Sequence, residues 1–240
     1  MGHHRHAVAI GACDIFLAIA FSSSLLFAEG KSPFSLQARL KAFYVSGIQD
    51  HDFAGTNYLE SDTELFLVPK IKGNYSFGGM LGGRFDLGSS FFQAVGLELG
   101  YRSSSHKYSF MDAESESTTA SFKSYFCILR AYFLKKKFVQ PFAYLSLGSS
   151  QLIVKNGSYS YTPPLRVGDA TYGGTEYGLG IGAALYLPAN FVLNAAAGYH
   201  VLLMKNVTGI LGTKYDTEAI RGTYPLFSVG LGYSFKLGRS

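Results

Sequence analysis

The residues best suited to chemistry are a run of three serines and a histidine, SSSH at residues 103–106, and a second histidine, His200, in a later apolar segment. A serine hydroxyl that is activated by a histidine base, with an acid behind it, can carry out acyl transfer or hydrolysis. Nothing in the spacing of these residues supports a complete triad, and His200 has no serine nearby in its own segment. We therefore predict no catalytic residues and expect a protein that is not an enzyme.

Two groups of residues have the types that bind metals. The histidines of the HHRH run at residues 3–6 belong to the basic start of a predicted secretory signal and would be removed with it. Five acidic residues between positions 50 and 64 could bind calcium, but their spacing is not that of an EF-hand loop. The sequence also has no phosphate-binding loop, dinucleotide fingerprint or zinc spacing. We expect neither a bound metal nor a cofactor.

Residues 1–28 predict a secretory signal, which leaves residues 29–240 as the mature domain. A basic start precedes an apolar stretch that ends at Ala28, a plausible cleavage site. The IGAC run at residues 10–13 resembles a lipobox, which would make Cys13 a lipid anchor, but it precedes most of the apolar stretch. After cleavage Cys127 would be the one remaining cysteine, so no intrachain disulfide is expected.

The composition of the whole chain, together with the lengths of its apolar segments after the predicted signal, indicates a membrane protein without membrane-spanning helices. The chain is 48% hydrophobic and 15% charged, yet no later segment reaches 18 apolar residues free of charge or dense glycine. A closed β-barrel is the other structure that can span a bilayer. The net charge is +5, but the basic residues form no patch with stacking aromatics, so we expect no binding of nucleic acid.

Eight stretches of about 9–13 residues alternate between an apolar and a small or polar side chain, as half-buried strands do. A tilted membrane strand needs roughly 9–11 residues. The stretches are 35–46, 76–87, 92–102, 122–134, 140–149, 176–187, 191–202 and 226–237. We therefore predict an all-β fold, an eight-stranded antiparallel up-and-down transmembrane β-barrel.

In the membrane-core part of these stretches the charged residues avoid the apolar face, because a charge facing hydrocarbon costs about 2–4 kcal/mol at the bilayer midplane. Lys123 has the apolar parity, but it lies at the outer edge of its stretch, where lipid headgroups would meet it. The opposite face carries Arg39, Lys41, Arg84, Asp86, Glu98, Arg102, Arg130, Glu176 and Lys236. An eight-stranded barrel is just wide enough for side chains to fill it, and buried charges must be paired. We expect a salt-bridged plug around Glu98 and Arg130, with Lys41 and Arg84 close by.

The connections alternate between short ones (88–91, 135–139, 188–190) and long ones (47–75, 103–121, 150–175, 203–225). Outer-membrane barrels place short turns in the periplasm and long loops outside. With that orientation, aromatic residues form a girdle at each interface. The outer girdle is Tyr44, Phe77, Tyr101, Tyr125, Tyr177, Tyr199 and Phe227, and the periplasmic girdle is Phe85, Phe133, Phe191 and Phe235. A soluble sandwich gives no reason for aromatics at strand ends only.

Three segments resemble the OmpA-like and opacity-type family of small outer-membrane barrels. They are QPFAYLSLG at 140–148, YGLGIGAALYLPANFVLNAAAGYH at 177–200 and FSVGLGYSF at 227–235. The resemblance extends from about residue 35 to the end and is strongest from residue 120 onward. The family usually ends on a terminal aromatic residue, whereas here five residues follow Phe235. The resemblance implies a location in the bacterial outer membrane.

Two functional classes fit this prediction. The first is a structural or surface-interaction protein, such as an adhesin or antigen, that binds a host or surface ligand through its four long loops. The second is a narrow conduit for small or hydrophobic solutes, similar to the OmpW group. A barrel enzyme that modifies lipid A and a soluble lipocalin-like barrel are further alternatives. As partners we expect outer-membrane lipids and an external ligand, and as oligomeric state a monomer.

Overall fold

The computed structural model describes residues 34–48, 52–87, 91–111, 119–134, 138–212 and 214–236, apart from the side chain of Lys236. The predicted signal at 1–28 lies outside the described residues. So do the acidic residues Asp50, Asp112, Glu114 and Glu116.

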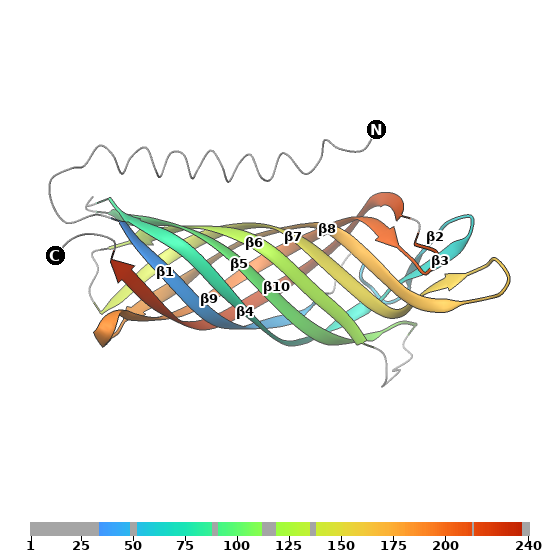
Figure 1. Cartoon of the computed structure of the whole chain (residues 1–240), viewed down its shortest axis with the longest axis horizontal. Helices are drawn as coiled ribbons and strands as arrows, with labels where there is room; N and C mark the ends of the chain where they lie inside the picture. Colours follow the sequence, from blue (N-terminus) through green and yellow to red (C-terminus); the bar gives the residue numbers. More distant parts are fainter. Residues whose placement is uncertain are drawn as a thin grey trace.

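Eight strands of the described chain close into a ring (Figure 1). They are β1 (Phe34–Ile48), β4 (Lys70–Asp86), β5 (Phe92–Ser109), β6 (Thr119–Phe133), β7 (Val139–Ser160), β8 (Val167–Tyr186), β9 (Phe191–Thr208) and β10 (Lys214–Lys236). Each strand pairs antiparallel with the next ring strand along the chain, and β10 pairs back onto β1. This confirms the predicted all-β, eight-stranded, antiparallel up-and-down barrel.

The short connections gather at one end of the barrel, which we call the turn end, and the long ones at the other, which we call the cap end (Figure 1). At the turn end the 3-10 helix η1 (Pro188–Asn190) joins β8 to β9. Pro188 cannot continue the strand ladder because it has no backbone N–H. Ala189 and Asn190 then take positive φ angles of 55° and 63°, which reverse the chain within three residues.

The ring strands are longer than the sequence predicts, at 15 to 23 residues. Strand β7 continues through residues 150–160, and β10 already begins at Lys214. The connections at the cap end are correspondingly shorter than the predicted loops. The predicted bounds end where the apolar alternation ends, but the backbone ladder needs only hydrogen bonds and therefore continues into the polar segments.

The polarity of the wall inverts along β7. Toward the turn end, Leu145 and Leu147 are exposed on the outside, and Ser146 is buried inside. Toward the cap end, Leu152 and Val154 are fully buried inside, and their neighbours Gln151 and Lys155 are exposed. The part near the turn end thus has a polar interior, whereas the part near the cap end has an apolar core.

A hairpin closes the cap end. Strands β2 (Asn57–Glu60) and β3 (Glu64–Val68) belong to the connection between β1 and β4, but β3 pairs with β7. In the ring order β7 is separated from β4 by β5 and β6, so this connection crosses the mouth of the barrel. Phe53 and Phe66 from this connection are buried in the apolar core. The barrel is therefore filled and covered at this end.

Among the described residues, no helix is long and apolar enough to cross a membrane.

Candidate functional site

The outer wall toward the turn end is an apolar band. Leu40 on β1 is 76% exposed, and Ile181 on β8, three strands away around the ring, is 70% exposed. Their neighbours of opposite parity, Arg39 and Lys41, are buried inside. The apolar faces predicted from the alternation all point outward, so the wall has the polarity of a barrel that hydrocarbon surrounds.

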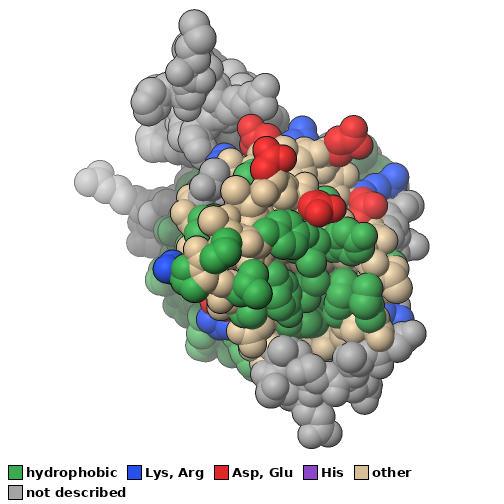
Figure 2. All heavy atoms as spheres, turned by 90° about the vertical axis from the view of Figure 1, so that its right-hand side faces the viewer, with side chains coloured by type: hydrophobic (Ala, Val, Ile, Leu, Met, Phe, Trp, Pro, Cys, Tyr) green, Lys and Arg blue, Asp and Glu red, His purple; other side chains and the backbone are tan. Residues whose placement is uncertain are grey.

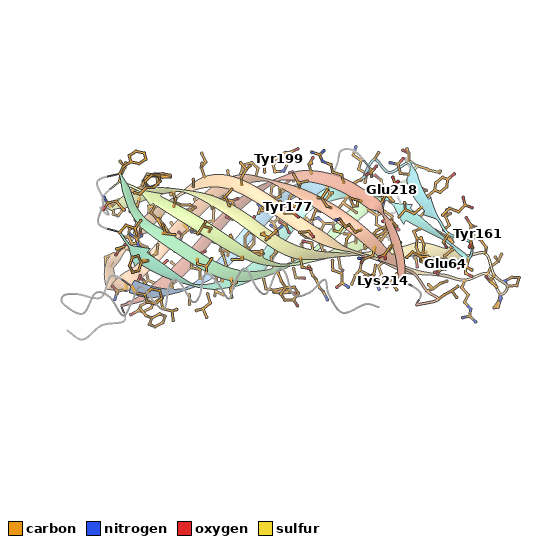
Figure 3. The ribbon with its side chains drawn as sticks, turned by 90° about the horizontal axis from the view of Figure 1, so that it is seen from above. Glu64, Tyr161, Tyr177, Tyr199, Lys214 and Glu218 are labelled. Carbon is orange, nitrogen blue, oxygen red and sulfur yellow. The ribbon has the colours of Figure 1, made fainter. Side chains whose placement is uncertain are left out.

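The predicted girdle residues lie on the outside of this band. Rings from adjacent strands contact each other at both edges: Tyr101 and Tyr125 have centroids 4.8 Å apart, and Phe191 and Tyr233 have centroids 5.4 Å apart. Figure 3 shows Tyr177 and Tyr199 on the wall of the barrel, away from the cap end. The outward-facing girdle side chains are Tyr44, Phe77, Tyr101, Tyr125, Tyr177, Tyr199, Phe227, Phe85, Phe133, Phe191 and Phe235.

Inside the barrel, the predicted residues gather around Glu98, and we call this group the Glu98 cluster. Arg130 Nη2 lies 3.0 Å from Glu98 Oε2, and Arg39 forms an ion pair with Oε1. Arg39 also hydrogen-bonds to Gln37 and donates to the Tyr132 hydroxyl at 3.2 Å. The charge of Lys41 acts on the same three charged groups. The structure therefore brings Glu98, Arg130 and Lys41 together and adds Arg39, which the sequence placed in the lumen but not in the plug.

Arg84 forms no ion pair with Glu98 but lies beside the Glu98 cluster, because its guanidinium lies 4.6 Å from the centre of the Tyr132 ring, whose hydroxyl accepts from Arg39. Arg84 Nη2 is 2.8 Å from Asp86 Oδ1, two residues along the same strand, and Nη1 donates to Gln140 Oε1 at 2.8 Å and to the Tyr186 hydroxyl. These partners lie toward the turn end of the lumen. Parity alone placed Arg84 inside, but the depth of Arg84 relative to Glu98 depends on strand register, which alternation does not determine.

A second cluster, which the sequence did not predict, surrounds Glu176 on β8. The carboxylate forms an ion pair with Arg102 and lies 2.6 Å from His200 Nδ1. It also accepts hydrogen bonds from the hydroxyls of Ser124 at 2.6 Å, Ser150 at 2.8 Å and Tyr224 at 2.7 Å. Each of the six consecutive ring strands from β5 to β10 thus contributes one side chain to this Glu176 cluster. All six share the inward parity, but their common height follows only from the register.

Glycines on the inner face of β8 make room for large lumen side chains. A Cβ at Gly182 would come within 2.5 Å of the Phe142 ring, and one at Gly178 within 2.6 Å of the His200 ring. Much of this room is therefore taken by aromatic rings and by His200, which lies in the Glu176 cluster.

The serine–histidine run at residues 103–106 lies beside an irregularity in the pairing of β4 with β5. Ser104 Oγ lies 2.6 Å from His106 Nε2, and His106 Nδ1 lies 2.8 Å from the carbonyl oxygen of Lys72. The pairing of β4 with β5 shifts register between Ile71 and Ser76, beside this carbonyl. Burial lowers the pKa of His106, and nearby Arg102 lowers it further, against the opposing effect of the carbonyl. A neutral ring that donates from Nδ1 and accepts from Ser104 fits this environment.

The cap end carries an exposed apolar surface. The outer ends of β2, β3, β7 and β8 form a small sheet in which Leu65 pairs with Tyr159 and Tyr159 pairs with Val167. Paired residues share one face of an antiparallel sheet, and this face points away from the buried Phe66. We call it the tip surface; with the adjoining turn it includes Tyr58, Leu65, Tyr159, Tyr161, Leu165 and Val167.

The tip surface combines aromatic residues with acidic ones. Tyr58 is 53% exposed and Leu165 is 78% exposed, and the Tyr161 hydroxyl donates to Glu60 Oε1 at 3.2 Å. Figure 2, which looks onto the cap end, shows hydrophobic side chains gathered at the centre with Asp and Glu side chains along one edge. Figure 3 places Tyr161 at this end together with Glu64, Lys214 and Glu218.

Within the described ranges, no three His, Cys, Asp or Glu side chains are grouped so that they could hold a metal ion.

Comparison with known proteins shows similarity in structure only. No protein-family model matches the sequence, and no curated protein matches it either. The solved structures that resemble it include Neisserial surface protein A, at 15% identity and a TM-score of 0.44, over 87% of this chain and 100% of that one. OprG from Pseudomonas aeruginosa has 13% identity and a TM-score of 0.48, over 87% and 99%. Ail from Yersinia pestis has 15% identity and a TM-score of 0.41, over 85% and 99%. The chain is similar in fold to these small barrels, and the similarity carries no argument about what it binds.

Proposed function

We propose that this chain is an integral outer-membrane β-barrel protein that acts through the tip surface, as an adhesin or surface antigen does. Residues 1–28 would be its secretory signal and residues 29–240 its barrel domain. The resemblance of β7, β8, β9 and β10 to the OmpA-like and opacity-type family supports the finer placement in that group. The apolar band supports outer-membrane lipids as the surroundings of the barrel, and we expect a monomer.

The observation that carries this proposal is the filled interior. Two ionic clusters occupy the lumen within the apolar band, and the apolar core and the β2–β3 hairpin close it at the cap end. A conduit along the axis would require all of these side chains to move. A rigid, closed barrel is instead suited to hold a recognition surface outside the membrane.

The tip surface has the composition of a recognition site. Tyrosine is enriched at protein interfaces because it offers a large contact area and a polar end at a small cost in conformational entropy. Tyr58, Tyr159 and Tyr161 lie on this one surface with Leu165 and Val167. Exposed apolar residues gathered in one patch indicate an interaction site more strongly than the same residues scattered singly.

The test is binding of bacteria that display the full chain to host cells and matrix proteins. A variant with Tyr58→Ser, Tyr161→Ser and Leu165→Ser should lose at least ~90% of the binding, because a few exposed aromatic and apolar side chains carry most of the binding energy of an interface. Lys205→Ala, an exposed change on β9, should bind like the parent. Planar-bilayer recordings test the alternative function, a conduit. Stable channel events, together with binding that the triple variant leaves unchanged, would favour the conduit and refute the surface role.

A further inference from the structure

A small cavity separates the two ionic clusters of the lumen. Its volume is about 20 Å³, which suits one particle of the size of a water molecule. Arg102, Glu176 and His200 line it on the side of the Glu176 cluster, and Lys41, Arg130 and Ser146 line it with them. The remaining wall is largely apolar and includes Phe43, Phe126, Ile128 and Leu226.

The charges around this cavity do not balance within the described side chains. Glu98 forms ion pairs with Arg39 and Arg130, and Lys41 is a third basic side chain close to it. The carboxylate of Glu176 is already matched by Arg102 and by the hydrogen bonds of its cluster. Among the residues that the structure describes, none forms an ion pair with Lys41, whose side chain is buried. The region therefore holds four basic side chains, Arg39, Lys41, Arg102 and Arg130, against two acidic ones, and an uncompensated buried charge is costly.

Unpartnered donors surround the same space. The Ser146 hydroxyl and the Nε atoms of Arg102 and Arg130 are buried and have no hydrogen-bond partner in the described part of the chain. All three residues line the cavity. A buried donor without an acceptor costs about 1–3 kcal/mol. Because unpartnered hydrogen-bond donors and basic side chains line the same cavity, the ligand that fits it is a hydrogen-bond acceptor with a negative charge.

We propose that this cavity binds a single small monovalent anion of the size of chloride, held by Lys41 and the Ser146 hydroxyl. The ion neutralises part of the excess charge and supplies the missing acceptor. A space that suits one particle of about the size of a water molecule favours a monatomic anion over a tetrahedral one such as sulfate, and the basic side chains around it disfavour a cation. The site lies between the clusters, so the ion completes a continuous polar column from Glu98 to Glu176.

Bromide replaces chloride at such sites and scatters X-rays anomalously. Crystals of the full barrel grown in sodium bromide should show an anomalous peak between Lys41 and Ser146, and crystals of Lys41→Met should not. Ordinary water density without an anomalous peak in the parent protein would overturn the proposal, whether or not the variant folds.

A solution experiment tests the same site through stability. The unfolding equilibrium in urea is measured at constant ionic strength while chloride replaces gluconate. Above the dissociation constant, each tenfold rise in chloride should favour the folded state by about tenfold. Lys41→Met and Ser146→Ala should weaken or abolish this dependence, and the surface change Lys205→Met should preserve it. An equal chloride dependence in the parent and in Lys41→Met would contradict the site.

Discussion

The imidazole of His200 on β9 lies against the carboxylate of Glu176 on β8, with Nδ1 2.6 Å from Oε1. The same carboxylate accepts from side chains on four other strands, so one acidic group joins six of the eight ring strands. Such a contact fixes the register of the wall from the inside. Removal of the carboxylate should lower the stability of the whole barrel, since every strand that it joins would lose a contact.

We expect Glu176→Gln to reduce the free energy of unfolding by about 3–5 kcal/mol, because the buried Arg102 guanidinium would lose its ionic partner. The measurement is a urea titration of the barrel in lipid vesicles, followed by far-ultraviolet circular dichroism because the chain has no tryptophan. Glu218→Gln, an exposed change at the cap end, is the matched control and should shift stability by less than about 0.5 kcal/mol. Equal effects of the two changes would show that the cluster does not hold the strands.

The apolar band predicts how the wall tolerates charge. Leu40 pairs with Leu231 in the middle of the band and is 76% exposed, so Leu40→Arg should cost about 2–4 kcal/mol in lipid. Leu165 is equally exposed at 78%, but it lies at the cap end, where Leu165→Arg should cost almost nothing. If both arginines were tolerated alike, hydrocarbon would not surround the band.

A lipid-dissolved photoreactive probe gives an independent check of the same orientation. It should modify Leu97, Leu179 and Leu231 and leave Glu98 and Arg130 unmodified. Mass spectrometry of the digested barrel locates the labels. The reverse pattern would place the lumen on the outside and remove the basis for the surface role.

The inner glycines should not tolerate a methyl group. A Cβ at Gly180 would overlap the Ala197 carbonyl oxygen and lie 2.5 Å from the Tyr144 ring, so Gly180→Ala should destabilise the barrel by about 1–3 kcal/mol. At Gly79, on the outer face of β4, the nearest atoms to a new Cβ are 3.8 Å away. Gly79→Ala should therefore be neutral or stabilising by up to about 1 kcal/mol. The denaturant midpoints of the two variants test this difference. Equal midpoints would show that the lumen around Gly180 has room for a methyl group.

The Ser104–His106 contact should make stability depend on pH. Burial lowers the pKa of His106 in the folded state, whereas in the unfolded chain the imidazole has a pKa of about 6.5. The neutral ring therefore contributes its full stabilisation above that pH, and the contribution is lost as pH falls toward the folded-state value. His106→Gln should flatten this part of the curve when urea midpoints are compared between pH 8 and pH 5. A curve that the substitution leaves unchanged would assign the pH dependence to other groups.

Much of the fold could be predicted because its strongest constraint is local. Alternation places Leu40 outside and Arg39 and Lys41 inside without reference to any other strand, and the solvent on each side determines the pattern. The strand count and the girdles follow from the same signal. The extension of β7 to Ser160 could not be read in this way, because its outer part has the polarity of a soluble barrel.

The relations between strands were harder to predict. Glu98 and Arg130 belong to adjacent strands, and a similar distance from the turn was enough to bring them together. Glu176 collects partners from strands as distant as β5 and β10, which requires the register of every pairing between them. The β2–β3 hairpin gave no usable signal, since its pairing with β7 lies far away in sequence.

The crossing of the barrel mouth by the β2–β3 hairpin has a consequence for the order of assembly. Strands β4, β5 and β6 separate β3 from its partner β7 in the chain, so β3 is made well before the strand with which it pairs. Docking of the hairpin must therefore wait until β7 has been made. Cysteines placed at Leu65 and Tyr159, which pair across β3 and β7, would form a disulfide only once the hairpin has docked, so the time of disulfide formation would report when the barrel is complete.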